Sequence, residues 1–241
     1  YFQWDIDYKR SIENGIDPAH NEFVHDTHGF SGERDDYRVG DLDFRENEWG
    51  SGFFNKVYAP PLAESKMRET SGRDKPAFIE AGTGHVCVSQ VWTYIHPTDK
   101  IKIHQYLFET PIDEDKTNLY LVNLRNFLIE PENDERMMER NEYVALQDRD
   151  ILTRVRPVIT PRTNTKEVFV PADKPIARYR QFLDEWKARG WRIDIDKVKA
   201  TENRVAYAIP SPGRREHKGW TIDAVPLLPG GQARGELKAA E

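Results

Sequence analysis

Cysteine is nearly absent from this chain, because its 241 residues include only Cys87. A single thiol excludes an intrachain disulfide framework, a cysteine-based zinc site and an iron–sulfur cluster held by this chain alone. Scarce cysteine also favours a reducing, cytoplasmic location. No apolar run reaches the length of a membrane span, so the sequence predicts no transmembrane protein.

An excess of positive charge is lacking as well. Lys and Arg total 35 against 41 Asp and Glu, which gives a net charge of −6. A general nucleic-acid binder needs a basic surface for phosphate contacts, so that class is excluded. The chain does contain 38% hydrophobic and 11% aromatic residues, which is enough to build a core.

The order of candidate elements points to an α+β fold. Turn-forming residues separate closely spaced strand candidates, which are 2–8, 77–80, 85–95, 101–109 and 118–126. Helical patterns follow at 134–155 and 174–189. This order predicts a curved antiparallel sheet wrapped around a long helix, with a ligand cavity between the two layers. We expect residues 1–228 to form one domain and 229–241 a flexible tail.

The segment from Asp17 to His25 carries the clearest chemical signal, Asp17-x2-His20-x4-His25. Two neutral imidazoles are good ligands for a borderline divalent metal such as Fe(II) or Zn(II). On a helix, Asp17 and His20 are neighbours about 60° apart, whereas His20 and His25 are about 140° apart. The two histidines therefore share a metal only if the helix ends or loosens before His25.

A carboxylate on the long helix is the best candidate for the third ligand. Asp148 has helical spacing to the residues that we expect to form the buried face, Val144, Ile151 and Val155. A buried carboxylate needs a metal or a cationic partner, so the alternative is a salt bridge to a nearby arginine. Asp150 points about 200° away and is predicted to be solvated.

Two stretches of the sequence resemble one known family. Asn14-x2-Asp17-x2-His20-x4-His25 and Gln147–Leu152 are similar to motifs in the catalytic domain of Rieske non-haem iron oxygenases. The resemblance is to the α subunit of the phthalate, vanillate and dicamba type. It implies a helix-grip fold and a mononuclear Fe(II) held by His20, His25 and Asp148. It also implies that Asn14 lies near the iron, although Asn14 is equally well explained as a helix cap.

The resemblance also implies partners outside this chain. Family members carry an upstream Rieske domain with a [2Fe–2S] cluster, which this chain lacks, so we expect the chain to be part of a longer protein. Asp17 would pass an electron from a neighbouring subunit's cluster, usually in a homotrimer. Electrons would come from NAD(P)H through a reductase or ferredoxin. With dioxygen, such an enzyme hydroxylates or demethylates an organic, typically aromatic substrate.

Two other functions remain open from the residues alone. A zinc hydrolase would use the same ligands with Glu22 as general base. A metal-free carrier of small ligands would have the same architecture. Strand alternation does not reveal which face looks inward, so the candidates for lining a pocket come from both: Val91, Trp92, Tyr106, Phe108, Leu121, Leu124 and Asn141. His104 reads as a structural or pocket-lining residue, whereas His28, His85 and His96 have no assigned role.

Overall fold

The structure is a computed structural model that describes residues 1–25, 38–59, 61, 68–70, 72–161, 167–190, 192–202, 204–208 and 222–230. The chain divides into two compact units, residues 1–179 and 180–241. The predicted domain boundary at residue 228 stays a prediction, and 231–241 of the predicted tail lie outside the described residues.

A seven-stranded antiparallel sheet forms the frame of the first unit, in the order β1-β7-β6-β5-β4-β3-β2. Its strands are β1 (Phe2–Trp4), β2 (Asp43–Asn47), β3 (Gly50–Ala59), β4 (Ala77–Val86), β5 (Gln90–His96), β6 (Ile103–Asp113) and β7 (Lys116–Arg125). Strands β2 to β7 are neighbours in the order of the sequence, as is usual for consecutive antiparallel strands. The N-terminal strand β1 closes the far edge by pairing with β7.

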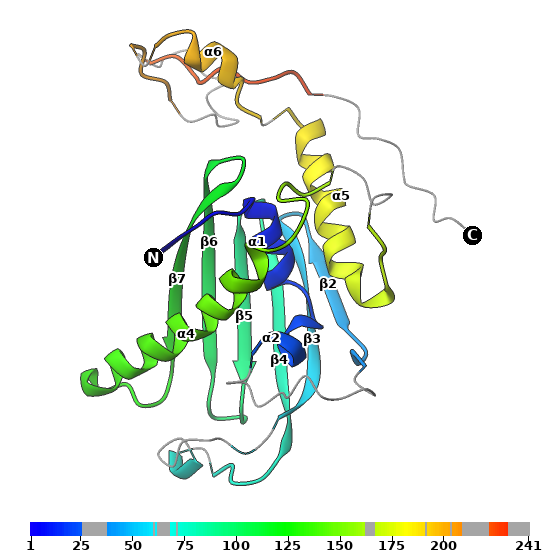
Figure 1. Ribbon diagram of the computed structural model, residues 1–241, viewed down its shortest axis with the longest axis vertical. Helices are drawn as coiled ribbons and strands as arrows, with labels where there is room; N and C mark the ends of the chain where they lie inside the picture. Colours follow the sequence, from blue (N-terminus) through cyan, green and yellow to red (C-terminus); the bar gives the residue numbers. More distant parts are fainter. Residues whose placement is uncertain are drawn as a thin grey trace. The chain divides into compact units, whose positions relative to one another are not determined.

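Three helices of the first unit lie over one face of this sheet (Figure 1). They are α1 (Tyr8–Gly15), α2 (His20–Val24) and the long α4 (Asp134–Leu152), which follows the 3-10 turn η2 (Pro131–Asn133). Helix α1 contacts β4, β5 and β6, and α2 contacts α4. The predicted α+β class, an antiparallel sheet with a long helix, is confirmed.

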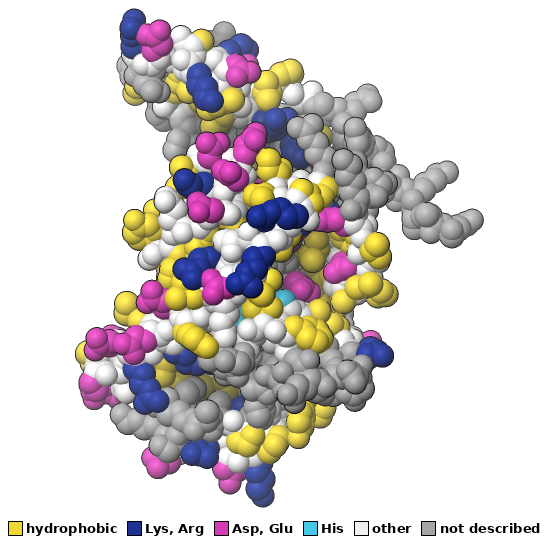
Figure 2. All heavy atoms as spheres, in the orientation of Figure 1, with side chains coloured by type: hydrophobic (Ala, Val, Ile, Leu, Met, Phe, Trp, Pro, Cys, Tyr) yellow, Lys and Arg dark blue, Asp and Glu magenta, His cyan; other side chains and the backbone are white. Residues whose placement is uncertain are grey.

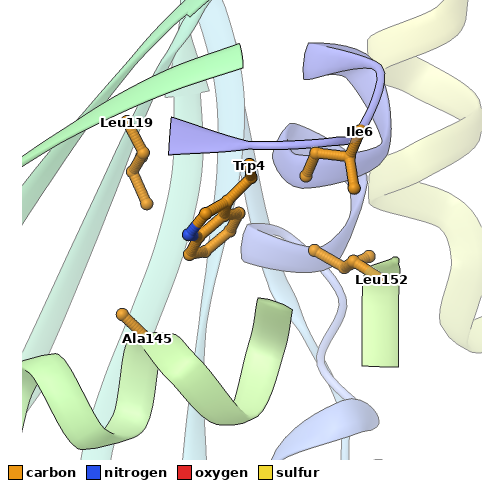
Figure 3. Close-up of a cluster of buried hydrophobic side chains, with 5 residues drawn as sticks. All are labelled: Trp4, Ile6, Leu119, Ala145 and Leu152. Atoms are coloured by element: carbon orange, nitrogen blue, oxygen red, sulfur yellow. The ribbon is translucent and has the colours of Figure 1, made fainter. Parts of the chain in front are cut away.

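The core between sheet and helix joins both ends of the first unit. Figure 3 shows Trp4 and Ile6 beside β1, Leu119 on β7, and Ala145 and Leu152 on α4. All five are at most 8% exposed. Each large apolar side chain buried in this way contributes roughly 1.5–3 kcal/mol. The core therefore fixes the part of α4 that carries Asp148 against β7.

One predicted turn is wrong, because Gly82-Thr83-Gly84 lies inside β4. The glycines make room for rings that lie flat on the sheet. A Cβ at Gly82 would stand 2.5 Å from Cδ1 of Phe54, and one at Gly84 would stand 2.6 Å from Cζ2 of Trp92. The actual reversal to β5 comes at Cys87, whose φ of 53° is left-handed.

The second unit begins within α5 (Lys174–Ala188), which continues across the boundary after the 3-10 turn η4 (Pro171–Asp173). Among the described residues of this unit, a further helix is α6 (Ile195–Lys199), whose N-cap Asp194 accepts a hydrogen bond from the Lys197 amide. The residue types at 204–209 predict a strand, but the structure shows only a single bridge between Ala208 and Ala224, and residue 209 lies outside the described part. In the described segments, no helix has the length and apolar character that crossing a bilayer requires.

Candidate metal centre

Two short helices joined by a tight turn present the histidines. Asp7 caps α1 by accepting a hydrogen bond from the Lys9 amide, and α1 ends at Gly15. Asp17 then opens the turn into α2, since its Oδ1 accepts from the Ala19 amide at 2.8 Å. Asx turns of this kind are a usual way to start a helix beside proline. The sequence pattern predicts one helix over 16–28; the structure limits it to α2 at His20–Val24, and residues 26–28 lie outside the described part.

The end of α2 resolves the angular problem of the two histidines. His25 lies just past the last helical residue, with extended backbone at φ −107° and ψ 95°. The extended conformation turns its side chain back toward the face that carries His20. The two rings meet edge to face, with centroids 5.2 Å apart. The prediction that the helix ends before His25 is confirmed.

His20, His25 and Asp148 converge on one point. One ligand atom from each lies within 4.8 Å of the other two. Asp148 Oδ1 is 3.2 Å from Nε2 of His25 and 3.9 Å from Nε2 of His20. Three ligand atoms about 2.1 Å from a shared metal, at right angles, would be about 3 Å apart. Small side-chain movements therefore bring this set into coordination distance, so the donor set fits a divalent metal.

Hydrogen bonds on the far side of each ring fix which nitrogen faces Asp148. Nδ1 of His20 lies 2.8 Å from the Asp17 carbonyl oxygen, and Nδ1 of His25 lies 3.1 Å from Oε1 of Gln147. Both partners are acceptors, so Nδ1 carries the proton in each neutral ring. The Nε2 lone pairs are then free to bind a metal, and the outer hydrogen bonds orient the rings as metal-binding histidines require.

The contact between Asp17 and His20 differs in one detail from what the helical spacing led us to expect. The main-chain oxygen of Asp17 makes the hydrogen bond, whereas its carboxylate Oδ2 lies 4.0 Å from the same nitrogen. The Asp17 side chain keeps 24% of its surface exposed. Its carboxylate therefore lies beside the ligand and remains accessible from outside.

Asp148 is held as a carboxylate. Burial acts to raise the pKa of Asp148, but when the two imidazoles are protonated, the hydrogen bond from His25, the charges of His20 and His25 and the Asn14 amide together lower it below its usual value. Nδ2 of Asn14 donates to Oδ1 of Asp148 at 3.0 Å. Asn14 thus reaches the carboxylate from the last turn of α1, and the structure places it as a support for Asp148.

Part of the reasoning that selected Asp148 is wrong. Ile151 is 46% exposed, and the buried residues of α4 are Ala145 and Leu152. Asp148 lies three residues after Ala145 and four before Leu152, so it faces the core side of α4 all the same. Asp150 is exposed and pairs with its neighbour Arg149, as expected for a solvated carboxylate.

Glu109 is a buried acid near this centre that sequence reasoning missed. It is 2% exposed, and its Oε1 accepts a hydrogen bond from Oγ of Ser11 at 2.6 Å, while Oε2 has no partner among the described residues. Burial raises the pKa of Glu109 to about 8, and the charge of Asp148 adds to the rise, although the Ser11 hydrogen bond opposes it. Strand alternation signals such a residue only once the inward face of β6 is known.

The helix-covered face of the sheet is now defined by contacts. Val91 meets Gly15 of α1, where an added Cβ would lie 3.1 Å from Cγ1 of Val91. Leu121 shares this face through its pairing with Leu107 opposite Val91. The remaining strand candidates lie on the opposite face, so they do not line a pocket between sheet and helices: Trp92, Tyr106, Phe108 and Leu124. Asn141 lies on α4, partly buried.

The centre is only slightly open to solvent. His25 is 3% exposed, while the side chains of His20 and Asp148 keep 14% and 17% of their surface. On the helix-covered face, histidine accounts for only a small patch among the described side chains (Figure 2). An enclosed donor set with limited access suits a bound metal that meets a small molecule.

Comparisons with known proteins agree with this geometry. A family model described as the vanillate O-demethylase oxygenase C-terminal domain matches residues 4–189. The chain therefore belongs to this family, whose members are catalytic domains of Rieske-type oxygenases, a class of oxidoreductases. No curated protein matches this chain.

Several solved structures share the fold. NdmA of Pseudomonas putida CBB5, solved with caffeine, has a TM-score of 0.62 and 16% identity, covering 78% of this chain and 51% of its own. Dicamba monooxygenase, solved with 3,6-dichlorosalicylic acid, has a TM-score of 0.60 and 16% identity, covering 82% of this chain and 58% of its own. The chain thus spans about half the length of the proteins it matches.

Proposed function

We propose that this chain is the catalytic domain of an oxygenase that hydroxylates or demethylates a small aromatic substrate with dioxygen. A mononuclear Fe(II) held by His20, His25 and Asp148 would supply the dioxygen chemistry, with coordination positions left open on one side. The observation that carries the proposal is the convergence of these three ligand atoms within 4.8 Å.

The chain's own groups set the geometry of that centre. The Asp17 carbonyl and the Gln147 side chain keep both Nε2 atoms turned inward, and Asn14 orients the carboxylate. Loss of a supporting contact of this kind typically lowers metal affinity or activity by roughly 10- to 100-fold. The low exposure of His25 keeps bulk water away from the reacting side, which limits side reactions.

The electrons would come from outside this chain. Asp17 is the residue we assign to electron transfer, from a Rieske [2Fe–2S] cluster of a neighbouring subunit to the iron. Its carboxylate lies 4.0 Å from a ligand histidine and is partly exposed, which supports the assignment. A homotrimer, a reductase or ferredoxin, and NAD(P)H as the ultimate donor belong to the same proposal.

The substrate class rests on similarity and on the low exposure of the metal-binding side chains. The family name refers to O-demethylation, and the two structures above contain caffeine and 3,6-dichlorosalicylic acid, both small ring compounds. A metal centre that is nearly closed on the histidine side favours a compact planar substrate over a polymer.

Metal content after anaerobic purification without chelators tests the proposal. We expect about one iron per chain, because two imidazoles and a carboxylate suit Fe(II). His20→Ala, His25→Ala and Asp148→Ala should each lose it. Asp150→Ala is the matched control on the same helix turn and should keep it, since that side chain pairs with Arg149 in solvent.

Two outcomes would contradict the assignment. Iron content equal to wild type in both histidine variants would show that His20 and His25 do not bind the iron. Stoichiometric zinc in place of iron, together with hydrolase activity lost in Glu22→Gln, would favour the zinc hydrolase. Glu22 is buried, and neither of its carboxylate oxygens has a hydrogen-bond partner in the described part of the chain.

A further inference from the structure

A second pair of histidines meets on the opposite face of the sheet, at one end of the β5–β6 hairpin. His96 ends β5 and His104 lies at the start of β6. Tyr94 is the direct partner of His104, so His96 is the diagonal neighbour of His104 on the same face. Their Nε2 atoms are 3.2 Å apart.

The surroundings of His96 fix its protonated nitrogen. Nδ1 of His96 lies 2.9 Å from Oε1 of Glu80, which is opposite His96 on β4. A carboxylate at Nδ1 places the proton there, so Nε2 of the neutral ring carries a lone pair directed at His104. A carboxylate behind a histidine is the usual outer partner of a metal-binding imidazole.

The ring of His104 is held in place by stacking. Tyr94 lies parallel to it, with centroids 4.0 Å apart and planes 26° apart, and the Tyr94 hydroxyl bonds to that of Tyr106 at 3.1 Å. Both rings are therefore oriented before any ligand arrives.

The separation of the two nitrogens fits a shared ion. Two imidazole nitrogens bound tetrahedrally at about 2.05 Å from zinc are about 3.3 Å apart. The alternative explanation is a hydrogen bond between two neutral imidazoles, in which Nε2 of His104 donates. Two features favour the metal site, because a simple hydrogen bond requires neither of them. Glu80 places a carboxylate behind His96, and the His96 side chain keeps 18% of its surface exposed.

We propose that His96 and His104, with Glu80 behind His96, form a second metal site that takes a borderline divalent cation such as Zn²⁺ or Cu²⁺. Water completes the coordination at this partly exposed position. The site is independent of the His20, His25 and Asp148 centre, because it is built on strands β4, β5 and β6 at the other face of the sheet, whereas that centre is built on α2 and α4. A bound ion would tie β5 to β6, with β4 joined through Glu80.

Zinc stoichiometry on chelator-stripped chain tests the site. With Zn²⁺ alone as the probe, His96→Ala and His104→Ala should each bind one equivalent fewer than the wild type. Glu80→Gln should keep the equivalent but bind it roughly 10- to 100-fold more weakly. Phe108→Leu is the matched control, because Phe108 is an exposed residue on the same face of β6, and this variant should bind as the wild type does. Equal stoichiometry in wild type, His96→Ala and His104→Ala would overturn the proposal.

A measurement on the wild type guards against misfolded variants. Long-range ¹H–¹⁵N NMR spectra should show the Nε2 resonances of His96 and His104 shifting on addition of Zn²⁺ while their Nδ1 resonances stay protonated. Unshifted Nε2 resonances at saturating zinc would overturn the site. The test is separate from that of the oxygenase centre: His20→Ala should retain the shift, whether or not it loses iron.

Discussion

At the scale of single residues, Glu109 is a carboxyl group that the folded chain keeps protonated. Its ordinary pKa is 4.5, and burial raises it to about 8. The folded protein therefore binds a proton that the unfolded chain releases above pH 4.5. By linkage, the contribution of this group to stability is complete at acid pH, falls as the pH rises from about 4.5 to 8, and is lost above that.

Glu109→Gln should remove this pH dependence, because glutamine keeps the shape of the neutral acid and does not titrate. We expect the free energy of unfolding of the variant, relative to wild type, to rise by roughly 3–4 kcal/mol between pH 5 and pH 8. Urea denaturation at several pH values measures it. Glu114→Gln, an exposed site after β6, is the control and should follow the wild-type curve. Parallel curves for wild type and Glu109→Gln would mean that Glu109 is already ionised at pH 5.

Asp17 allows a second prediction at the same scale. Asp17→Asn keeps the Oδ1 acceptor that the Ala19 amide needs, so α2 and the iron should persist. It removes the charge beside His20, so substrate oxidation by the full-length protein should fall by roughly 10- to 100-fold or more. Rapid mixing of reduced enzyme, substrate and oxygen gives the rate of cluster oxidation. A wild-type rate with intact iron would take Asp17 off the electron path.

At the scale of elements, the glycines of β4 leave the space in which the aromatic rings pack against this face of the sheet. A Cβ at Gly84 would lie 2.5 Å from the Ser51 carbonyl oxygen as well as near Trp92, and backbone does not give way cheaply. Gly84→Ala should therefore lower the free energy of unfolding by about 2 kcal/mol or more. Gly40→Ala is the control, with nothing within 4 Å of the new atom. Equal denaturation midpoints for the two variants would show that β4 and β3 can move apart.

The same elements show how far sequence reasoning reaches. The predicted helices 134–155 and 174–189 differ by at most three residues from α4 and α5, because their apolar periodicity and stop signals are local. The Gly82–Gly84 turn was mistaken because glycine also permits close packing of rings, here Phe54 and Trp92, which the sequence places far from it. The local sequence pattern predicts whether a segment is a helix or a strand. Packing against neighbouring elements determines whether an ambiguous residue such as glycine lies in a turn or in a strand.

In the same way, some residues of the candidate sites could be predicted from the sequence and others could not. His20, His25 and Asp148 were named from spacing, and the end of α2 before His25 followed from helix geometry. Glu109 and the His96–His104 pair could not be predicted from the sequence, because each depends on which face of a strand points where and on the register between neighbouring strands. Trp92 and Tyr106 are pocket candidates from the sequence for the same reason, because alternation leaves the inward face open and only the strand register places them on the opposite face.

At the scale of the whole molecule, the chain spans about half the length of its structural relatives, and its one cysteine cannot ligate a Rieske cluster. Insertion of one oxygen atom reduces dioxygen by four electrons. The substrate provides two, and the other two must come from outside. Under the proposed function, a ferrous ion in this chain has only one to give.

The iron-loaded chain alone should therefore form less than one product molecule per iron when given substrate and oxygen. Mass spectrometry of product against measured iron tests this. Addition of an electron donor should raise the yield above one, and His20→Ala with the same donor is the control for metal left in solution. Several turnovers without any added donor would contradict the dependence on an outside cluster.

The two histidine sites differ in how much chain each encloses. His96 and His104 are 8 residues apart, whereas the contact from His25 to Gln147, next to Asp148, joins residues 122 apart. Closing the longer loop costs roughly 2–3 kcal/mol more in chain entropy, about four doublings of length. A folding chain that meets metal ions would therefore assemble the hairpin site first. The iron centre would be completed only when β7 has paired and α4 has docked, so its occupancy reports that the first unit is fully folded.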